Sequence, residues 1–189
     1  MSLASSLPLS SHFTAFELGA DKPEANDAIV SNLRFTAGRL ERIRAALASR
    51  LQVNTTTHRN RGFRTPAENV SVDGSSTSDH VRGLAADFVP LDFPGGLADA
   101  YTALRESEIG PFDQLIFYPG SRYIHAGFDG NRQEFRVKLF EGSGGTPLIG
   151  SDFAQTLAGS VAFAAQKNPV GSIAVIAATV LFLVAITKK

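Results

Sequence analysis

One stretch of eleven residues, from Ser78 to Phe88, places the strongest constraint on how this chain can fold. It holds His80 and Asp87, with Gly83 and small apolar residues between them. Imidazole and carboxylate groups are both good ligands of Zn²⁺. On one helix these two side chains would lie about 10 Å apart along the axis, too far to share a metal ion directly. A loop that carries His80 and turns at Gly83 into a strand that carries Asp87 would bring both side chains to one ion.

The residues around Asp87 favour the strand. Residues 84–89 are apolar except for Asp87. A carboxylate inside such a strand needs a partner, because burying an unpaired charge is costly, and a metal ion is one such partner. The chain has no cysteine, so any metal site must use histidine, aspartate or glutamate.

The pattern Ser-x-His-x-x-Gly-x-Ala-x-Asp in this stretch resembles the first metal motif of the zinc D-Ala-D-Ala carboxypeptidase and murein endopeptidase family, which is related to the lysostaphin and Hedgehog group. Two further runs resemble the same family: residues 62–69, which read Gly-Phe-Arg-Thr-Pro and end in Asn, and residues 117–125, which end in Tyr-Ile-His. The resemblance extends over roughly residues 12–140. All fixed positions of the first motif are met, by Ser78, His80, Gly83, Ala85 and Asp87.

The resemblance implies a zinc site with three protein ligands, His80, Asp87 and His125. Three protein ligands with a fourth position open is the pattern of a catalytic zinc site. The resemblance also implies that Ser78 and Arg64 bind substrate, since the planar guanidinium of Arg64 can hold a carboxylate or an oxyanion through paired hydrogen bonds. The implied activity is that of a zinc peptidase on peptidoglycan peptides, either as a D,D-carboxypeptidase or as a cross-link endopeptidase.

The general base that amide hydrolysis requires is not identified by the motif. Relatives carry an acidic residue at the position of Arg122 or at the position of Gly127. The acidic residues that remain as candidates for the general base are Asp113, Asp129 and Glu134. We rank Asp113 first because it directly precedes a predicted strand.

The alternative to a peptidase is a membrane-anchored protein that binds zinc and peptidoglycan, in a structural or virion role, with impaired catalysis. A third possibility is a chance motif that binds no zinc.

Periodicity along the chain predicts an α+β domain over residues 1–141, in which helices flank a small antiparallel sheet that carries the zinc site. Apolar residues recur at helical spacing over residues 23–49 and 97–107. Thr14 with Glu17 forms a capping-box pattern that begins a short helix. A turn at residues 129–132 is expected to join the last two strands. Strands are expected at residues 51–55, 84–89, 114–118, 123–128 and 134–140.

The C-terminal segment predicts a membrane anchor. Residues 170–187 carry no charge, and at 1.5 Å per residue they would span roughly 27 Å, close to the thickness of about 30 Å of a bilayer core. A buried core helix is the alternative. We expect a transmembrane helix over residues 169–189, preceded by a linker at 142–151 and an interfacial helix at 152–168.

Charge and termini suggest the partners and the location. The formal net charge is zero, which does not suggest binding to nucleic acid. The N-terminus lacks the basic start and apolar core of a signal peptide. The resemblance implies peptidoglycan as a partner, and the charge-free run over residues 170–187 predicts a lipid bilayer as a second one. A wall hydrolase with an anchor and no export signal is typical of a phage protein, which would be located in a virion membrane or in the bacterial inner membrane and act in entry or lysis.

Overall fold

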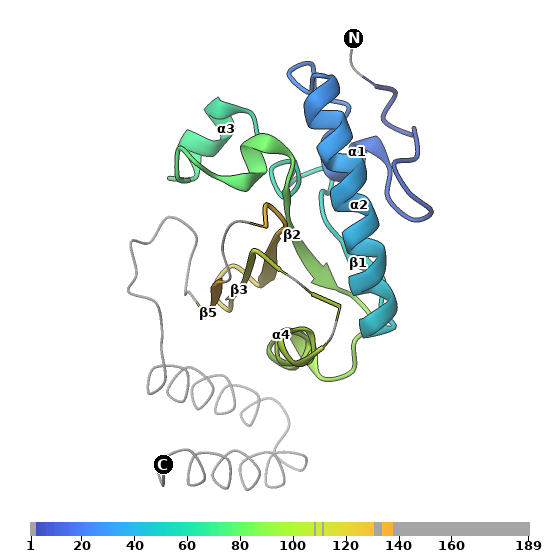
Figure 1. Cartoon of the computed structure of the whole chain (residues 1–189), viewed down its shortest axis with the longest axis vertical. Helices are drawn as coiled ribbons and strands as arrows, with labels where there is room; N and C mark the ends of the chain where they lie inside the picture. Colours follow the sequence, from blue (N-terminus) through green and yellow to red (C-terminus); the bar gives the residue numbers. More distant parts are fainter. Residues whose placement is uncertain (1–2, 108, 111, 131–133, 138–189) are drawn as a thin grey trace, which may run out of the picture. The chain divides into compact units, whose positions relative to one another are not determined.

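The structure, a computed structural model, describes residues 3–107, 109–110 and 112–130, and the backbone of residues 134–137 (Figure 1). The chain divides into two units, residues 1–146 and 147–189, and every described residue lies in the first. The predicted linker, interfacial helix and transmembrane anchor lie outside the described residues. Within the described part, no helix is long and apolar enough to cross a membrane.

A mixed sheet with the strand order β1-β2-β4-β3-β5 forms the centre of the described unit. The pairs β1–β2, β2–β4 and β3–β4 are antiparallel, as predicted. The fifth strand runs parallel to β3, so the expectation of an antiparallel sheet is wrong for this strand. Strand β4 pairs with β2 on one side and with β3 on the other, and β5 adds to the edge that β3 leaves free. The strands are β1 (Leu51–Gln52), β2 (Ala85–Pro90), β3 (Gln114–Tyr118), β4 (Tyr123–Gly127) and β5 (Glu134–Val137).

Four α-helices and a 3₁₀ turn surround the sheet in the described part of the chain. The capping box predicted at Thr14 is present, because the side chain of Glu17 accepts a hydrogen bond from the Thr14 backbone while Thr14 Oγ1 accepts one from Glu17 N. The helix predicted at residues 23–49 is also present, capped by the side chain of Asn26. The elements are α1 (Ala15–Leu18), α2 (Asp27–Leu47), α3 (Pro66–Ser71), the 3₁₀ turn η1 (Asp79–Arg82) and α4 (Gly96–Glu106).

The two faces of the sheet have different roles. Successive side chains of a strand point to opposite faces, so Phe117 of β3 and Ile124 of β4 share one face. Helix α4 packs on this face, where the ring of Tyr101 lies 6.0 Å from that of Phe117, centroid to centroid. Helix α2 contacts both α4 and β2, and its buried side chains lie between Leu33 and Leu47. The opposite face carries Asp87 and His125.

Candidate metal centre

His80 is held by a single turn of 3₁₀ helix that ends at Gly83. The backbone of Gly83 is left-handed, with φ of +73°, which glycine adopts without strain. A Cβ at Gly83 would also lie 3.1 Å from the side chain of Leu33 and from the carbonyl oxygen of Ile29. The chain then continues into β2, which carries Asp87. The predicted arrangement, a turn at Gly83 between a loop histidine and a strand aspartate, is therefore confirmed.

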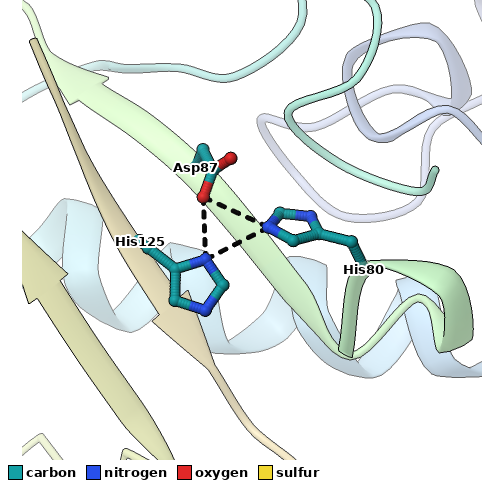
Figure 2. Close-up of side chains that lie close together, drawn as sticks. All are labelled: His80, Asp87 and His125. Atoms are coloured by element: carbon teal, nitrogen blue, oxygen red, sulfur yellow. Dashed lines mark hydrogen bonds and ion pairs between the residues drawn. The ribbon is translucent and has the colours of Figure 1, made fainter. Parts of the chain in front are cut away.

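Asp87 and His125 lie directly opposite each other on the adjacent strands β2 and β4. Both side chains point to the same face, where His80 reaches them from η1 (Figure 2). His125 Nδ1 lies 2.8 Å from Asp87 Oδ1, and His80 Nε2 lies 3.2 Å from Asp87 Oδ1 and 3.1 Å from His125 Nδ1. The three residues are buried. The structure thus brings together the three ligands that the sequence predicts.

The hydrogen bonds of His80 show that this site is suited to a cation. His80 Nδ1 lies 2.7 Å from the carbonyl oxygen of Gly62, which can only accept a hydrogen bond, so Nδ1 carries the hydrogen. In the neutral ring Nε2 is then a lone pair. This lone pair faces the Asp87 carboxylate oxygen at 3.2 Å. Two acceptors at this distance repel each other unless a proton or a metal ion lies between them.

The three donor atoms are also spaced as zinc ligands. A tetrahedral zinc ion with bonds of about 2.1 Å separates its ligand atoms by about 3.4 Å. The three distances at this site, 2.8, 3.1 and 3.2 Å, are slightly shorter than that spacing. Two imidazoles and one carboxylate suit zinc chemically. The hydrogen bond from His80 to Gly62 O is the outer-shell contact that commonly orients a ligating histidine. We conclude that the residues present fit a zinc ion.

The protonation states of Asp87 and His80 favour the binding of a cation. Burial by itself would raise the pKa of Asp87, but its neighbours His80, Arg64 and His125 outweigh burial and hold this pKa well below its usual range. Burial, together with the charge of Arg64, lowers the pKa of His80. Near neutral pH the site therefore combines an ionised carboxylate with a neutral His80 ring, which are the forms that bind metal.

Arg64 lies next to the triad and is as buried as the ligands. Its Nη2 lies 2.5 Å from Asp87 Oδ2, and its Nε donates a hydrogen bond to the carbonyl oxygen of Asn60. The carboxylate of Asp87 therefore turns one oxygen toward the two histidines and the other toward Arg64. This is the environment of a residue that orients a ligand. The predicted role of Arg64 in binding substrate stays a prediction, as does that of Ser78, which is partly exposed just before η1.

The structure does not bring Asp113 to the triad. Its carboxylate belongs to a separate group with Asp79 and Asp129, whose oxygen atoms lie within 4.8 Å of one another. Arg82 pairs with two members of this group: its Nη2 contacts Asp79 and lies 3.0 Å from Asp129 Oδ2. The role of Asp113 as general base stays a prediction that this placement does not favour.

Two features of the site were missed from the sequence. The carbonyl of Gly62 fixes the tautomer of His80, and no sequence signal identifies a backbone acceptor. The short helix α3 follows directly after Arg64 and does have a signal, since Thr65 caps it, Pro66 begins it and Glu68 completes a capping box. Lys22 reinforces this segment by donating to the Phe63 carbonyl and to Glu68.

Comparison with known proteins places the site within a family. A family model described as peptidase M15 matches residues 11–127, which is more than half of the chain and includes all three ligand positions. No curated protein matches the chain.

Proposed function

Because this chain belongs to the peptidase M15 family, we propose that it is a zinc-dependent peptidase that hydrolyses peptide bonds of peptidoglycan, as a D,D-carboxypeptidase or as a cross-link endopeptidase. The observation that carries the proposal is the convergence of His80 Nε2, His125 Nδ1 and Asp87 Oδ1 at distances of 2.8–3.2 Å. Three ligands leave the fourth position of a tetrahedral ion for water or substrate.

Each residue of the site has a definable task in this reaction. His80 and His125 would hold zinc through Nε2 and Nδ1, and Asp87 would hold it through Oδ1. When bound, zinc supplies a water molecule that is acidic near neutral pH and polarises the scissile carbonyl. Arg64 fixes the second oxygen of Asp87, and the Gly62 carbonyl keeps the hydrogen of His80 on Nδ1.

Digestion of purified peptidoglycan tests this proposal. The zinc-loaded full chain should release muropeptides whose masses identify the bond that is cut, and a chelator or the substitution His125→Ala should abolish the release. Restoring zinc after chelation should restore activity of the unaltered chain. If zinc-loaded protein releases no product from peptidoglycans of different cross-link chemistry, the proposed hydrolysis is wrong.

The position of the acidic residues favours a second candidate. Among the described residues, the donor group at the triad contains one carboxylate, Asp87, which the metal would use, and Asp113 lies in the other group. A protein of this kind could bind zinc and peptidoglycan without hydrolysing it. A pull-down with insoluble peptidoglycan separates the candidates: zinc-dependent retention without any product supports the binding protein, whereas release of product supports the peptidase.

We also propose that residues 169–189 anchor the protein in a membrane and that the protein comes from a phage, acting in entry or lysis. The support for the anchor is the charge-free run over residues 170–187. The full chain should then stay with membranes during alkaline carbonate extraction. Release into the soluble fraction would contradict the anchor.

A further inference from the structure

Three arginines lie in the segment that leads to the metal centre, and two of them have carboxylate partners. Arg59 Nη2 lies 2.5 Å from Asp21 Oδ1, and Arg64 pairs with Asp87. Arg61 is partly exposed. Within the described ranges, no carboxylate pairs with Arg61. Arg61 is therefore the arginine of this segment that has no acidic side chain as a partner among the described residues.

The position of Arg61 is fixed relative to the metal ligands at its backbone. Its carbonyl oxygen accepts a hydrogen bond of 2.7 Å from the backbone N–H of Asp87. On its other side, Asn54 Oδ1 accepts a hydrogen bond of 2.9 Å from the Arg61 N–H. The segment thus runs alongside β2 at the ligand itself, and the Cα of Arg61 cannot move away without breaking both contacts.

The side chain of Arg61 lies on the metal-bearing face of the sheet. Its guanidinium carbon lies 5.5 Å from the centroid of the Tyr123 ring, within the range of a cation–π contact. Tyr123 precedes His125 by two residues on β4, so both side chains point to the same face, and their Cα atoms are separated by about 7 Å along the strand. The charge of Arg61 therefore lies on the same face of the sheet as the triad, over a ring two residues from the ligand His125.

The ring under the Arg61 guanidinium belongs to an apolar cluster. Tyr118 and Tyr123 lie opposite each other on β3 and β4, with ring centroids 5.0 Å apart. Ile116 belongs to the same buried cluster, and Val89 packs against it. A guanidinium that rests on an aromatic ring keeps the N–H groups in its plane for hydrogen bonds, and its planar fork matches a carboxylate.

We propose that Arg61 binds a carboxylate of the substrate peptide, and that the protein thereby selects peptides with a free carboxylate close to the scissile bond. This inference rests on the proposed peptidase function. It assigns carboxylate recognition to Arg61 and not to Arg64, whose guanidinium is committed to the ligand Asp87 and to the Asn60 carbonyl. Moving Arg64 to a substrate would break both of these buried contacts, which is unfavourable.

A pair of peptides that differ in one charge tests the subsite. The probes are N-acetyl-L-Lys-D-Ala-D-Ala with a free C-terminal carboxylate and the same peptide with a C-terminal amide. Binding is measured by calorimetry and hydrolysis by chromatography, with the zinc-loaded full chain. A charge-assisted hydrogen-bonded pair changes affinity by about 10- to 100-fold. The unaltered protein should prefer the acid over the amide by that factor, and Arg61→Gln should remove the preference while its zinc content stays the same.

Arg59→Gln is the matched control, since it removes a neighbouring arginine that is paired with Asp21, and it should keep the preference for the acid. Arg61→Lys, which retains charge without the planar fork, should retain part of it. Equal binding of acid and amide by the unaltered protein, no binding of either, or an unchanged preference in Arg61→Gln overturns the subsite even if peptidoglycan is hydrolysed. A preference that depends on Arg61 without hydrolysis of either peptide supports the subsite and contradicts the peptidase.

Discussion

Arg64 and Asp87 form an ion pair that is buried on both sides, with 2.5 Å between Nη2 and Oδ2 and with side chains that are 2% and 1% exposed. Asp87 is also a predicted metal ligand through its other oxygen. Loss of Arg64 would therefore affect the fold and the metal site together. A neutral substitution leaves a buried carboxylate whose charge is compensated only when a metal is bound.

We expect Arg64→Gln to lower the stability of the metal-free protein by about 3–5 kcal/mol, the usual cost of breaking a buried ion pair from one side. Loss of an outer-shell partner should weaken zinc binding by about 10- to 100-fold. Urea denaturation and competition with a chromophoric chelator measure the two effects. Arg50→Gln is the control, because Arg50 pairs with Asp92 at the exposed surface. Unchanged zinc affinity in Arg64→Gln would show that Arg64 does not support the ligand.

The full chain should bind one zinc ion per molecule at the triad. His80→Ala and His125→Ala should each remove it, because two ligands hold zinc far more weakly than three. The unaltered chain should gain stability on addition of zinc, since metal binding contributes to the free energy of folding. Elemental analysis of dialysed protein measures the metal content, and zinc retained at full stoichiometry in both variants would place the site elsewhere.

The stability of the metal-free protein should fall as the pH is lowered from about 7.5 to 5.5. Burial lowers the pKa of His80, whereas a histidine in the unfolded chain has a pKa of about 6.5. Below that pH the unfolded chain takes up a proton that folded His80 does not, so the free energy of unfolding decreases.

The pKa of Asp87 is held low, so its stabilising contribution is present above about pH 4 and does not produce this slope. The decrease from His80 should be on the order of 1 kcal/mol between pH 6.5 and 5.5. Urea denaturation across this range, in the presence of chelator, measures it. His80→Gln should flatten the slope, and an equal slope in that variant would assign the proton uptake to another group.

Arg82 should stabilise the fold from a position outside the triad. It contacts Asp79, whose side chain is 0% exposed, and Asp129, while its own side chain remains 45% exposed. Arg82→Gln weakens the compensation of a buried carboxylate, which should cost about 1–3 kcal/mol. Thermal denaturation measures the loss, and the exposed Arg50→Gln should show little change. Equal effects of the two substitutions would mean that Arg82 contributes no more than a surface arginine.

Local patterns predicted most of the elements that position the site. The strand at Gln114–Tyr118 has the expected bounds, and the His80–Gly83–Asp87 spacing correctly predicted a turn into a strand. Pairing across the sheet was not predictable in the same way. The position of β5 depends on which strand edge is free once β2 and β3 have paired with β4, and this is decided by contacts between distant residues.

The environment of the arginines was also beyond the sequence pattern. The motif indicates that Arg64 is important, but its burial against Asp87 depends on how residues 60–64 run beside β2. The same path leaves Arg61 over Tyr123, although no motif marks Arg61. Likewise, the ranking of Asp113 rested on its place before a strand, and the fold places its carboxylate with Asp79 and Asp129.

The path of Gly62 connects the metal centre to the beginning of the chain. Its carbonyl accepts the hydrogen of His80, a Cβ at this position would clash with the backbone of Leu18, and the next residue, Phe63, donates its N–H to the Leu18 carbonyl. A shortened protein that starts after α1 would keep every metal ligand. It would lack the backbone of Leu18, which packs against Gly62, the residue whose carbonyl accepts the hydrogen bond from His80. Metal affinity would then report on the integrity of the N-terminus, far from the motif that defines the site in sequence.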